Sequence, residues 1–154
     1  MTTLCCDVLA ALKGKTLSTA ESLTGGGIGA ALTAIPGSSE VYCGGVISYT
    51  NAVKASVLGV PSEVLERFGA VSRQTAEHMA LGVRKLLRTD VSVAVTGLAG
   101  PGGDEYGNPV GTVFIAYADA AKTVVKHCVF AGSREDVRRQ TAQAALKLIL
   151  ENNK

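Results

Sequence analysis

The chain has 154 residues, of which 47% are hydrophobic and 18% charged, and its net charge is +2. This length fits a single domain over residues 1–154 with a buried core. Nucleic-acid binding needs a broad basic surface and usually aromatic side chains, and a charge of +2 with 5% aromatic residues does not provide them. No apolar run approaches the about 18 residues of a membrane span. We therefore expect neither a nucleic acid nor a membrane as a partner.

The first segment predicts a short helix and no export signal. Apolar residues recur at helical spacing over Cys5–Leu12, and Gly14 ends the pattern. Asp7 interrupts the apolar run and two lysines follow it, unlike a signal peptide. The four cysteines have no metal-ligand spacing, which predicts buried free thiols, no metal site and a cytoplasmic location.

A strand-to-helix junction follows. Thr16–Thr19 predicts a strand, and Gly25–Ile35 predicts a helix. Between them the chain reads Ala20-Glu21-Ser22-Leu23-Thr24-Gly25-Gly26-Gly27. Such a junction offers unpaired backbone N–H groups to an anion or an oxyanion, and a serine there could be a nucleophile. Ser22 or Thr24 could equally be a helix cap, so both alternatives stay open at this point.

Two phosphate-loop motifs fail on spacing. Gly14-Lys15-Thr16 ends like a Walker A motif, but Leu9 stands where its first glycine belongs. Gly25–Ala30 fits the dinucleotide fingerprint formally, but Glu21 to Thr24 separate these glycines from the strand. No acidic residue ends a second strand at the required distance, so a full dinucleotide-binding domain is not expected.

A second candidate segment is Ser48-Tyr49-Thr50-Asn51-Ala52-Val53-Lys54. Gly45–Tyr49 predicts a short strand and Asn51–Leu58 a helical turn or two, which puts Tyr49 at a strand end and Lys54 in the next element. A desolvated lysine has a lowered pKa and could be the general base for Ser22. Alternatively, Asn51 caps the helix and Lys54 is solvated.

A glycine-rich loop follows the most apolar strand. Helices are predicted from Pro61 to Phe68 and, capped by Ser72, from there to about Leu87. Val91–Thr96 then predicts a central buried strand that leads into Gly97–Gly103. Ligands of α/β sheets gather beyond the carboxyl ends of strands, so this loop predicts ligand contact, with a plain long turn as the alternative.

The last third predicts a hairpin and a long helix. Val110–Ala118 and Thr123–Phe130 form the antiparallel strands, and Ser133 opens a helix to about Leu150 through a capping box. Early alternation of strands and helices with a late hairpin predicts an α/β fold, a three-layer α/β/α sandwich with a mixed, mostly parallel sheet.

Charged side chains of the last helix form a further candidate site. Arg134 and Arg138 lie one turn apart and could hold a phosphate, or they could lie on a solvated helix face. His78 and His127 belong to no motif, and we expect both to be structural.

Six segments in order resemble the C-terminal domain of the competence/damage-inducible CinA family, the stand-alone nicotinamide-mononucleotide deamidases: AESLTGG, SYTNAVK, GAVS, TGLAGPGG, PVGTV and GSREDVRRQ. The resemblance spans about Leu17 to Leu150. It implies hydrolysis of the carboxamide of nicotinamide mononucleotide to the acid and ammonia, in pyridine-nucleotide recycling, by a metal-independent serine amidase without a cofactor. One alternative is a non-catalytic nucleotide-binding or regulatory module of the same fold, and another is a different small amidase that uses the same Ser–Lys pair.

The resemblance also implies residue roles. Ser22 matches the nucleophile, Lys54 the base and Tyr49 the tyrosine beside that base. The substrate-binding positions it implies are Thr24, Gly25, Gly26, Thr96, Gly97, Ala99, Gly100, Arg134 and Arg138. Independently of the resemblance, the mean hydropathy of +0.26 predicts a homo-oligomer with buried subunit contacts.

Overall fold

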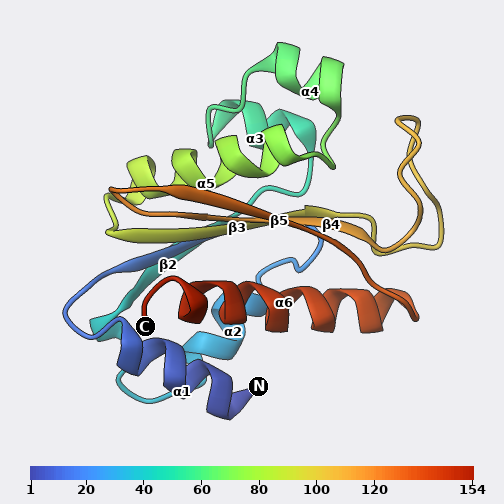
Figure 1. Ribbon diagram of the computed structural model, residues 1–154. Coiled ribbons are helices and arrows are strands. Elements are labelled where there is room, and N and C mark those ends of the chain that lie inside the picture. Colours follow the sequence, from blue (N-terminus) through green and yellow to red (C-terminus); the bar gives the residue numbers. More distant parts are fainter.

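A five-stranded sheet divides the molecule into layers in the computed structural model, which describes residues 1–154 (Figure 1). Its order is β2-β1-β3-β4-β5. The strands are β1 (Leu17–Glu21), β2 (Tyr42–Ile47), β3 (Val91–Gly97), β4 (Thr112–Ala118) and β5 (Thr123–Val129). The pairs β1/β2 and β1/β3 are parallel, whereas β3/β4 and β4/β5 are antiparallel. Only β4 therefore runs against the other strands, which confirms the mixed, mostly parallel sheet.

Helices cover both faces of this sheet, as Figure 1 shows. One face carries α3 (Asn51–Ser56), α4 (Ser62–Phe68) and α5 (Arg73–Leu87), and the other carries α1 (Thr2–Ala11), α2 (Gly27–Thr33) and α6 (Arg134–Glu151). A single turn of 3-10 helix, Ser38–Glu40, precedes β2. The predicted three-layer α/β/α sandwich is confirmed.

The central strand β3 separates two hydrophobic cores. Val93 and Val95 belong to the cluster beneath α6, while Ala94 belongs to the cluster beneath α5. Side chains alternate between the faces of a strand, so the nearly all-apolar run of β3 supplies both cores. All three residues are fully buried, as predicted for a central strand.

Strand β2 lies earlier than predicted. It spans Tyr42–Ile47 rather than Gly45–Tyr49, because its ladder with β1 begins at Tyr42. Gly44 and Gly45 obscure this strand in the sequence, since glycine is rare in strand interiors. A Cβ at Gly45 would overlap the Thr19 hydroxyl of β1. The glycine is thus required by the close approach of the two strands.

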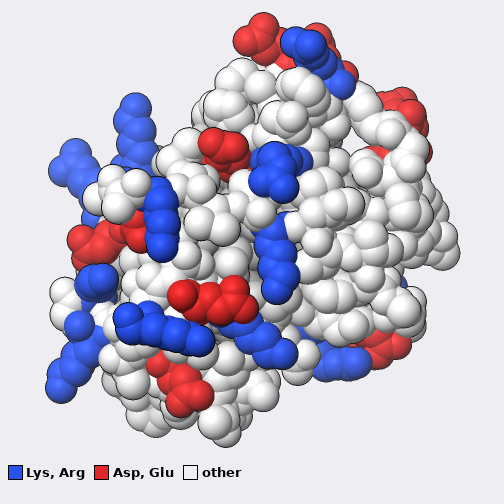
Figure 2. Space-filling model, in the orientation of Figure 1, with Lys and Arg blue, Asp and Glu red and all other residues white.

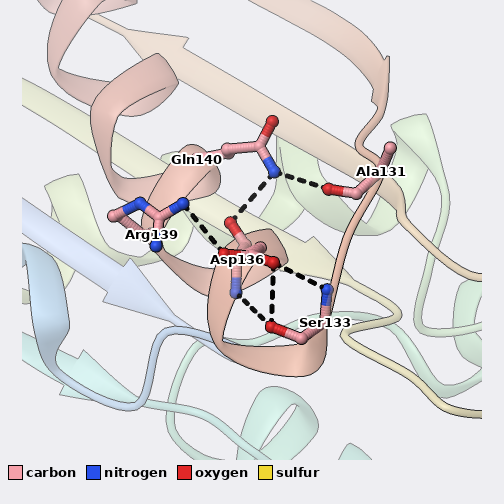
Figure 3. Close-up of polar contacts among 5 residues, drawn as sticks. All are labelled: Ala131, Ser133, Asp136, Arg139 and Gln140. Carbon is pink, nitrogen blue, oxygen red and sulfur yellow. Dashed lines mark hydrogen bonds and ion pairs between the residues drawn. The ribbon is translucent and has the colours of Figure 1, made fainter.

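The N-terminus of α6 is held by the predicted capping box (Figure 3). The Ser133 hydroxyl accepts from the Asp136 N–H at 3.2 Å, and the Asp136 carboxylate accepts from the Ser133 N–H at 2.9 Å. Arg139 donates to that carboxylate at 2.9 Å, and the Gln140 amide donates to the Ala131 carbonyl at 2.8 Å. These bonds fix where the helix begins and therefore where its first-turn side chains point.

Charged side chains add little to the stability of the fold. Arg139–Asp136 is the one salt bridge of the chain, and it is solvent-exposed. On the face drawn in Figure 2, Lys and Arg side chains gather on the left, with Asp and Glu side chains among them. No helix is both long and apolar enough to cross a membrane.

Candidate active site

The sequence-predicted site residues meet where β1, β2 and β3 end. Glu21, the last residue of β1, is paired with Ile47 of β2 and Val95 of β3. Beyond it, the Ser22 N–H donates to the Val95 carbonyl at 3.1 Å, and the Ser48 N–H donates to the Glu21 carbonyl at 2.9 Å. Parallel strands thus bring two segments that are distant in sequence to one edge of the sheet.

Lys54 reaches the Ser22 hydroxyl from α3. Its Nζ lies 3.0 Å from Ser22 Oγ, 2.7 Å from the Ser48 carbonyl oxygen and 3.5 Å from the Tyr49 carbonyl oxygen. The Lys54 side chain is 1% exposed and Ser22 is 7% exposed. Burial lowers the pKa of Lys54 from 10.5 to about 8. Lys54 is therefore a buried amine and not a solvated surface lysine.

The hydrogen bonds around Nζ suit a neutral amine. A neutral lysine has two N–H groups and one lone pair. The carbonyls of Ser48 and Tyr49 can accept both hydrogens, which leaves the lone pair for the Ser22 hydroxyl. In the charged form the third hydrogen points to Ser22 Oγ. The same geometry therefore accepts a proton from serine and returns it, as a general base must.

The N-cap of helix α3 lies one residue before the expected cap, Asn51. The Thr50 hydroxyl accepts from the Val53 N–H at 3.4 Å, and Thr50 is the N-cap. Asn51 is instead the first helical residue. Starting at Thr50 puts the fourth helical residue, Lys54, over the end of β2, and the Lys54 N–H completes the first turn by donating to the Thr50 carbonyl.

Glu21 caps helix α2, in place of Ser22 or Thr24. Its buried carboxylate accepts from the N–H groups of Ile28 and Gly29 at 2.9 and 3.1 Å, and from the Thr24 hydroxyl at 2.7 Å. The N-terminus of this helix therefore already holds an anion from the chain itself. The Ser22 side chain is left free for Lys54.

The glycines between Ser22 and α2 form a tight turn. Gly25 and Gly26 have φ of 58° and 100°, the left-handed region that glycine tolerates. The Gly25 N–H donates to the Ser22 carbonyl at 3.1 Å, so it is occupied by the turn. The Gly26 N–H donates to no protein acceptor. Of these two expected substrate-binding glycines, Gly26 is the one with a free N–H.

The loop after β3 carries further unpaired N–H groups. Thr96 is buried, and its hydroxyl donates to the Ala70 carbonyl at 2.7 Å. Gly97 still pairs within the sheet, and Gly100 adopts a φ of 100°. The N–H groups of Ala99 and Gly100 donate to no protein acceptor. These two consecutive N–H groups are available to a ligand.

Arg134 joins this loop to the segment after β2. Its guanidinium donates to the Gly100 carbonyl at 2.6 Å and to the Tyr49 hydroxyl at 3.0 Å. The Tyr49 side chain is 58% exposed and its hydroxyl is bonded to Arg134. Only the backbone carbonyl of Tyr49 faces Lys54. The structure thus places the Tyr49 side chain with the arginine rather than with the base.

Arg138 holds the turn that follows the nucleophile. Its Nε donates to the Leu23 carbonyl at 2.9 Å, and its Nη2 donates to the Thr24 carbonyl at 3.3 Å. The Nη1 of Arg138 and the Nε of Arg134 have no protein acceptor. Both arginines therefore tie α6 to the site and keep donors available for a bound anion.

Other candidate chemistry lies outside this edge. No three His, Cys, Asp or Glu side chains form a group that could hold a metal ion. All four cysteines are free thiols, as predicted, but only Cys5 is buried, whereas buried thiols were expected. His127 stacks on Phe114 with the ring centroids 4.5 Å apart, a structural contact between β5 and β4.

Two residues of the site had no role in the sequence-based interpretation. Glu21 forms the α2 cap described above, and Ser48 supplies the closest acceptor of Lys54 Nζ. The Ser48 hydroxyl is the one buried side-chain polar atom of the chain that has no hydrogen-bond partner.

Comparisons with known proteins give one family. The model of the CinA C-terminal domain matches residues 2–152. A CinA-like protein of Parasynechococcus marenigrum is 60% identical over 111 residues, which cover 71% of this chain and 26% of that protein. A CinA-like protein of a Cyanothece species is 50% identical over 149 residues, which cover 91% and 36%. The chain spans about a third of the length of these curated relatives.

Solved structures agree over nearly the whole chain. The competence damage-inducible protein A of Klebsiella pneumoniae superposes with a TM-score of 0.95 at 38% identity, covering 97% of this chain and 94% of that one. The competence/damage inducible protein CihA of Agrobacterium tumefaciens gives a TM-score of 0.95 at 40% identity, covering 99% and 95%. The chain therefore belongs to the CinA C-terminal domain family.

Proposed function

We propose that this protein is a nicotinamide-mononucleotide deamidase that uses Ser22 as nucleophile and Lys54 as general base. The observation that carries the proposal is the 3.0 Å contact between Lys54 Nζ and Ser22 Oγ, with the lysine 1% exposed. A lysine held without a carboxylate partner is suited to proton transfer rather than to ion pairing. The substrate is proposed from the resemblance of the sequence motifs to the nicotinamide-mononucleotide deamidases.

The first half of the reaction forms an acyl-enzyme. Lys54 takes the hydroxyl proton as Ser22 Oγ attacks the carboxamide carbon of the substrate. The resulting oxyanion needs preorganised donors, and the free N–H of Gly26, in the turn that follows Ser22, is the candidate. Lys54 then gives its proton to the leaving nitrogen, the C–N bond breaks and ammonia departs.

The second half hydrolyses the ester. A water molecule attacks the acyl carbon while Lys54 removes one of its protons. The Oγ–C bond breaks, Lys54 returns the proton to Ser22, and nicotinate mononucleotide leaves. For the 5′-phosphate we assign the free N–H groups of Ala99 and Gly100 and the spare guanidinium donors of Arg134 and Arg138.

Ammonia release tests the proposal directly. The purified protein is incubated with nicotinamide mononucleotide, and ammonia and the acid mononucleotide are quantified against time. Equimolar appearance of both products is expected, with a loss of at least about 10³-fold in kcat for Ser22→Ala and for Lys54→Met. Activity of Ser22→Ala within a few-fold of wild type would refute the nucleophile.

Binding without turnover would favour the alternative. If nicotinamide mononucleotide binds but releases no ammonia, the domain is a nucleotide-binding module rather than this amidase. A panel of other primary amides then separates a change of substrate from a loss of catalysis, because ammonia from another amide would retain the Ser22 chemistry.

A further inference from the structure

Glu21 is a buried carboxylate with an unusual set of partners. It is 2% exposed, and it accepts from two backbone N–H groups of α2 and from the Thr24 hydroxyl. The Thr19 hydroxyl adds a longer bond at 3.3 Å and itself lies 2.7 Å from the Tyr42 hydroxyl. A buried carboxylate is retained only where such donors replace water.

No cation balances this charge. The salt bridge of the chain lies elsewhere, on Asp136 and Arg139. Lys54 Nζ is bonded to Ser22, Ser48 and Tyr49 and not to Glu21. The carboxylate is directed into α2, whose N-terminal N–H groups neutralise it. A negative charge thus stands one residue from the nucleophile without forming an ion pair with the base.

The same bonds fix the turn that carries Ser22. On its strand side, the Ser22 N–H is bonded to the Val95 carbonyl of β3. On its helix side, the chain passes through Gly25 and Gly26, which have the greatest backbone freedom of any residue type. The Glu21 carboxylate spans this weak point by binding Thr24 and the first turn of α2 together.

We propose that Glu21 is the positioning residue of the nucleophile. It locks the Ser22–Gly26 turn to α2 so that Ser22 Oγ stays on the Lys54 amine, and it acts through this lock and not through its charge on the lysine. The inference rests on the proposed nucleophilic role of Ser22. Its test therefore includes a reaction of Ser22 that needs no nucleotide.

A small neutral alkyl fluorophosphonate supplies that reaction. Ser22 Oγ forms a bond to phosphorus as the P–F bond breaks, Lys54 takes the hydroxyl proton, and fluoride leaves. The rate of labelling is measured at pH 9 by intact mass, and the site by peptide mapping. Glu21→Gln keeps the shape but places an NH₂ group against a backbone donor, so we expect labelling at least tenfold slower than in wild type.

Two further variants separate positioning from stability. Leu32→Ala removes a fully buried side chain from the same helix and should lower the melting temperature while leaving labelling within twofold. Thr24→Val removes only the 2.7 Å bond to Glu21 and should slow labelling several-fold even if Glu21→Gln fails to fold. Labelling of both Glu21→Gln and Thr24→Val within twofold of wild type would overturn the proposal.

The pH dependence distinguishes the lock from a charge effect. With Glu21→Gln, the midpoint of the labelling profile should stay where wild type has it while the plateau falls. A lower midpoint with an unchanged plateau would show that the carboxylate acts on the Lys54 amine and would overturn the positioning role.

Failure of the proposed function gives a different pattern. A wild-type protein that labels at Ser22 but releases no ammonia from nicotinamide mononucleotide defeats the deamidase and leaves the Glu21 comparison intact. Where turnover occurs, Glu21→Gln should lower kcat with KM within about twofold. A wild-type labelling rate no faster than that of Lys54→Met would remove the activated nucleophile and the role of Glu21 with it.

Discussion

At the scale of the residue, the pKa of the buried Lys54 amine determines the pH range in which the proposed site is active. Desolvation lowers its pKa to about 8, and the neutral form is the one that accepts the Ser22 proton. Below pH 8 the neutral fraction falls tenfold per unit, so about one-tenth of the sites are competent at pH 7. An ordinary lysine would leave about one in three thousand.

The first prediction follows from that titration. The kcat/KM for nicotinamide mononucleotide should rise about tenfold per pH unit and level off above pH 8, because kcat/KM reports the free enzyme. Initial rates between pH 5.5 and 9.5 measure it. Tyr49→Phe serves as a control, since only its backbone faces the lysine, and its profile should keep the same midpoint. A flat profile would exclude Lys54 as the base.

The contact between Ser22 and Lys54 was not accessible from local spacing. The two residues are 32 positions apart, and the register of β1 with β2 brings them together. The family resemblance named both, but no local signal showed that Lys54 would be buried. Glu21 was missed because a helix cap usually stands next to its helix, whereas this one lies seven residues before Ile28.

At the scale of the element, local patterns located most helices and strands. The caps at Ser72 and Ser133, the hairpin of β4 and β5, and the buried strand β3 all followed from periodicity and capping signals, which are short-range. The predicted position of strand β2 was wrong because Gly45 is required by the close approach of β1, and a local pattern cannot show a contact with a neighbouring strand.

The second prediction concerns Gly82 in the middle of α5. Alanine is the better helix former by about 1 kcal/mol, yet a Cβ here would overlap the Leu58 carbonyl oxygen just after α3. Gly82→Ala should therefore lower the melting temperature by about 5 °C or more and reduce turnover, since it displaces the segment that follows Lys54.

Gly27→Ala is the matched control for stability. Its Cβ would meet only the Thr24 Cβ, at an ordinary 3.9 Å, so the melting temperature should hold or rise slightly. Thermal unfolding of both variants by circular dichroism makes the comparison. Equal effects at the two positions would argue that backbone entropy, and not the contact with Leu58, governs Gly82.

At the scale of the whole molecule, the buried lysine costs stability at neutral pH. The unfolded chain titrates Lys54 near 10.5 and the folded chain near 8, so between these values the unfolded state binds more protons and stability rises with pH. Below pH 8 the buried charged lysine lowers the free energy of unfolding by its full amount, at most about 3 kcal/mol. The fold thus sacrifices stability at the point where it places its proposed base.

The third prediction is that Lys54→Met is more stable than wild type at pH 7. The gain in free energy of unfolding should be about 1–3 kcal/mol and should shrink as the pH rises from 8 to 10.5. Urea unfolding at pH 7 and pH 10 measures it, with the exposed Lys85→Met as a control that should show no such change. A constant difference at both pH values would contradict the cost assigned to the amine.

The backbone of the site divides into bonded and unbonded amides, and this division should be visible in hydrogen exchange. The Ser22 and Ser48 amides are hydrogen-bonded to the carbonyls of neighbouring strands, so their hydrogens should exchange only when the whole domain unfolds. The Gly26, Ala99 and Gly100 amides are unbonded and should exchange within seconds. If bound product slows exchange at these three amides and leaves the first two unchanged, the hydrogen-bonded backbone around Ser22 and Lys54 is rigid, and the substrate binds to amides that make no bond within the protein. Product binding that protects none of them would move the substrate contacts elsewhere.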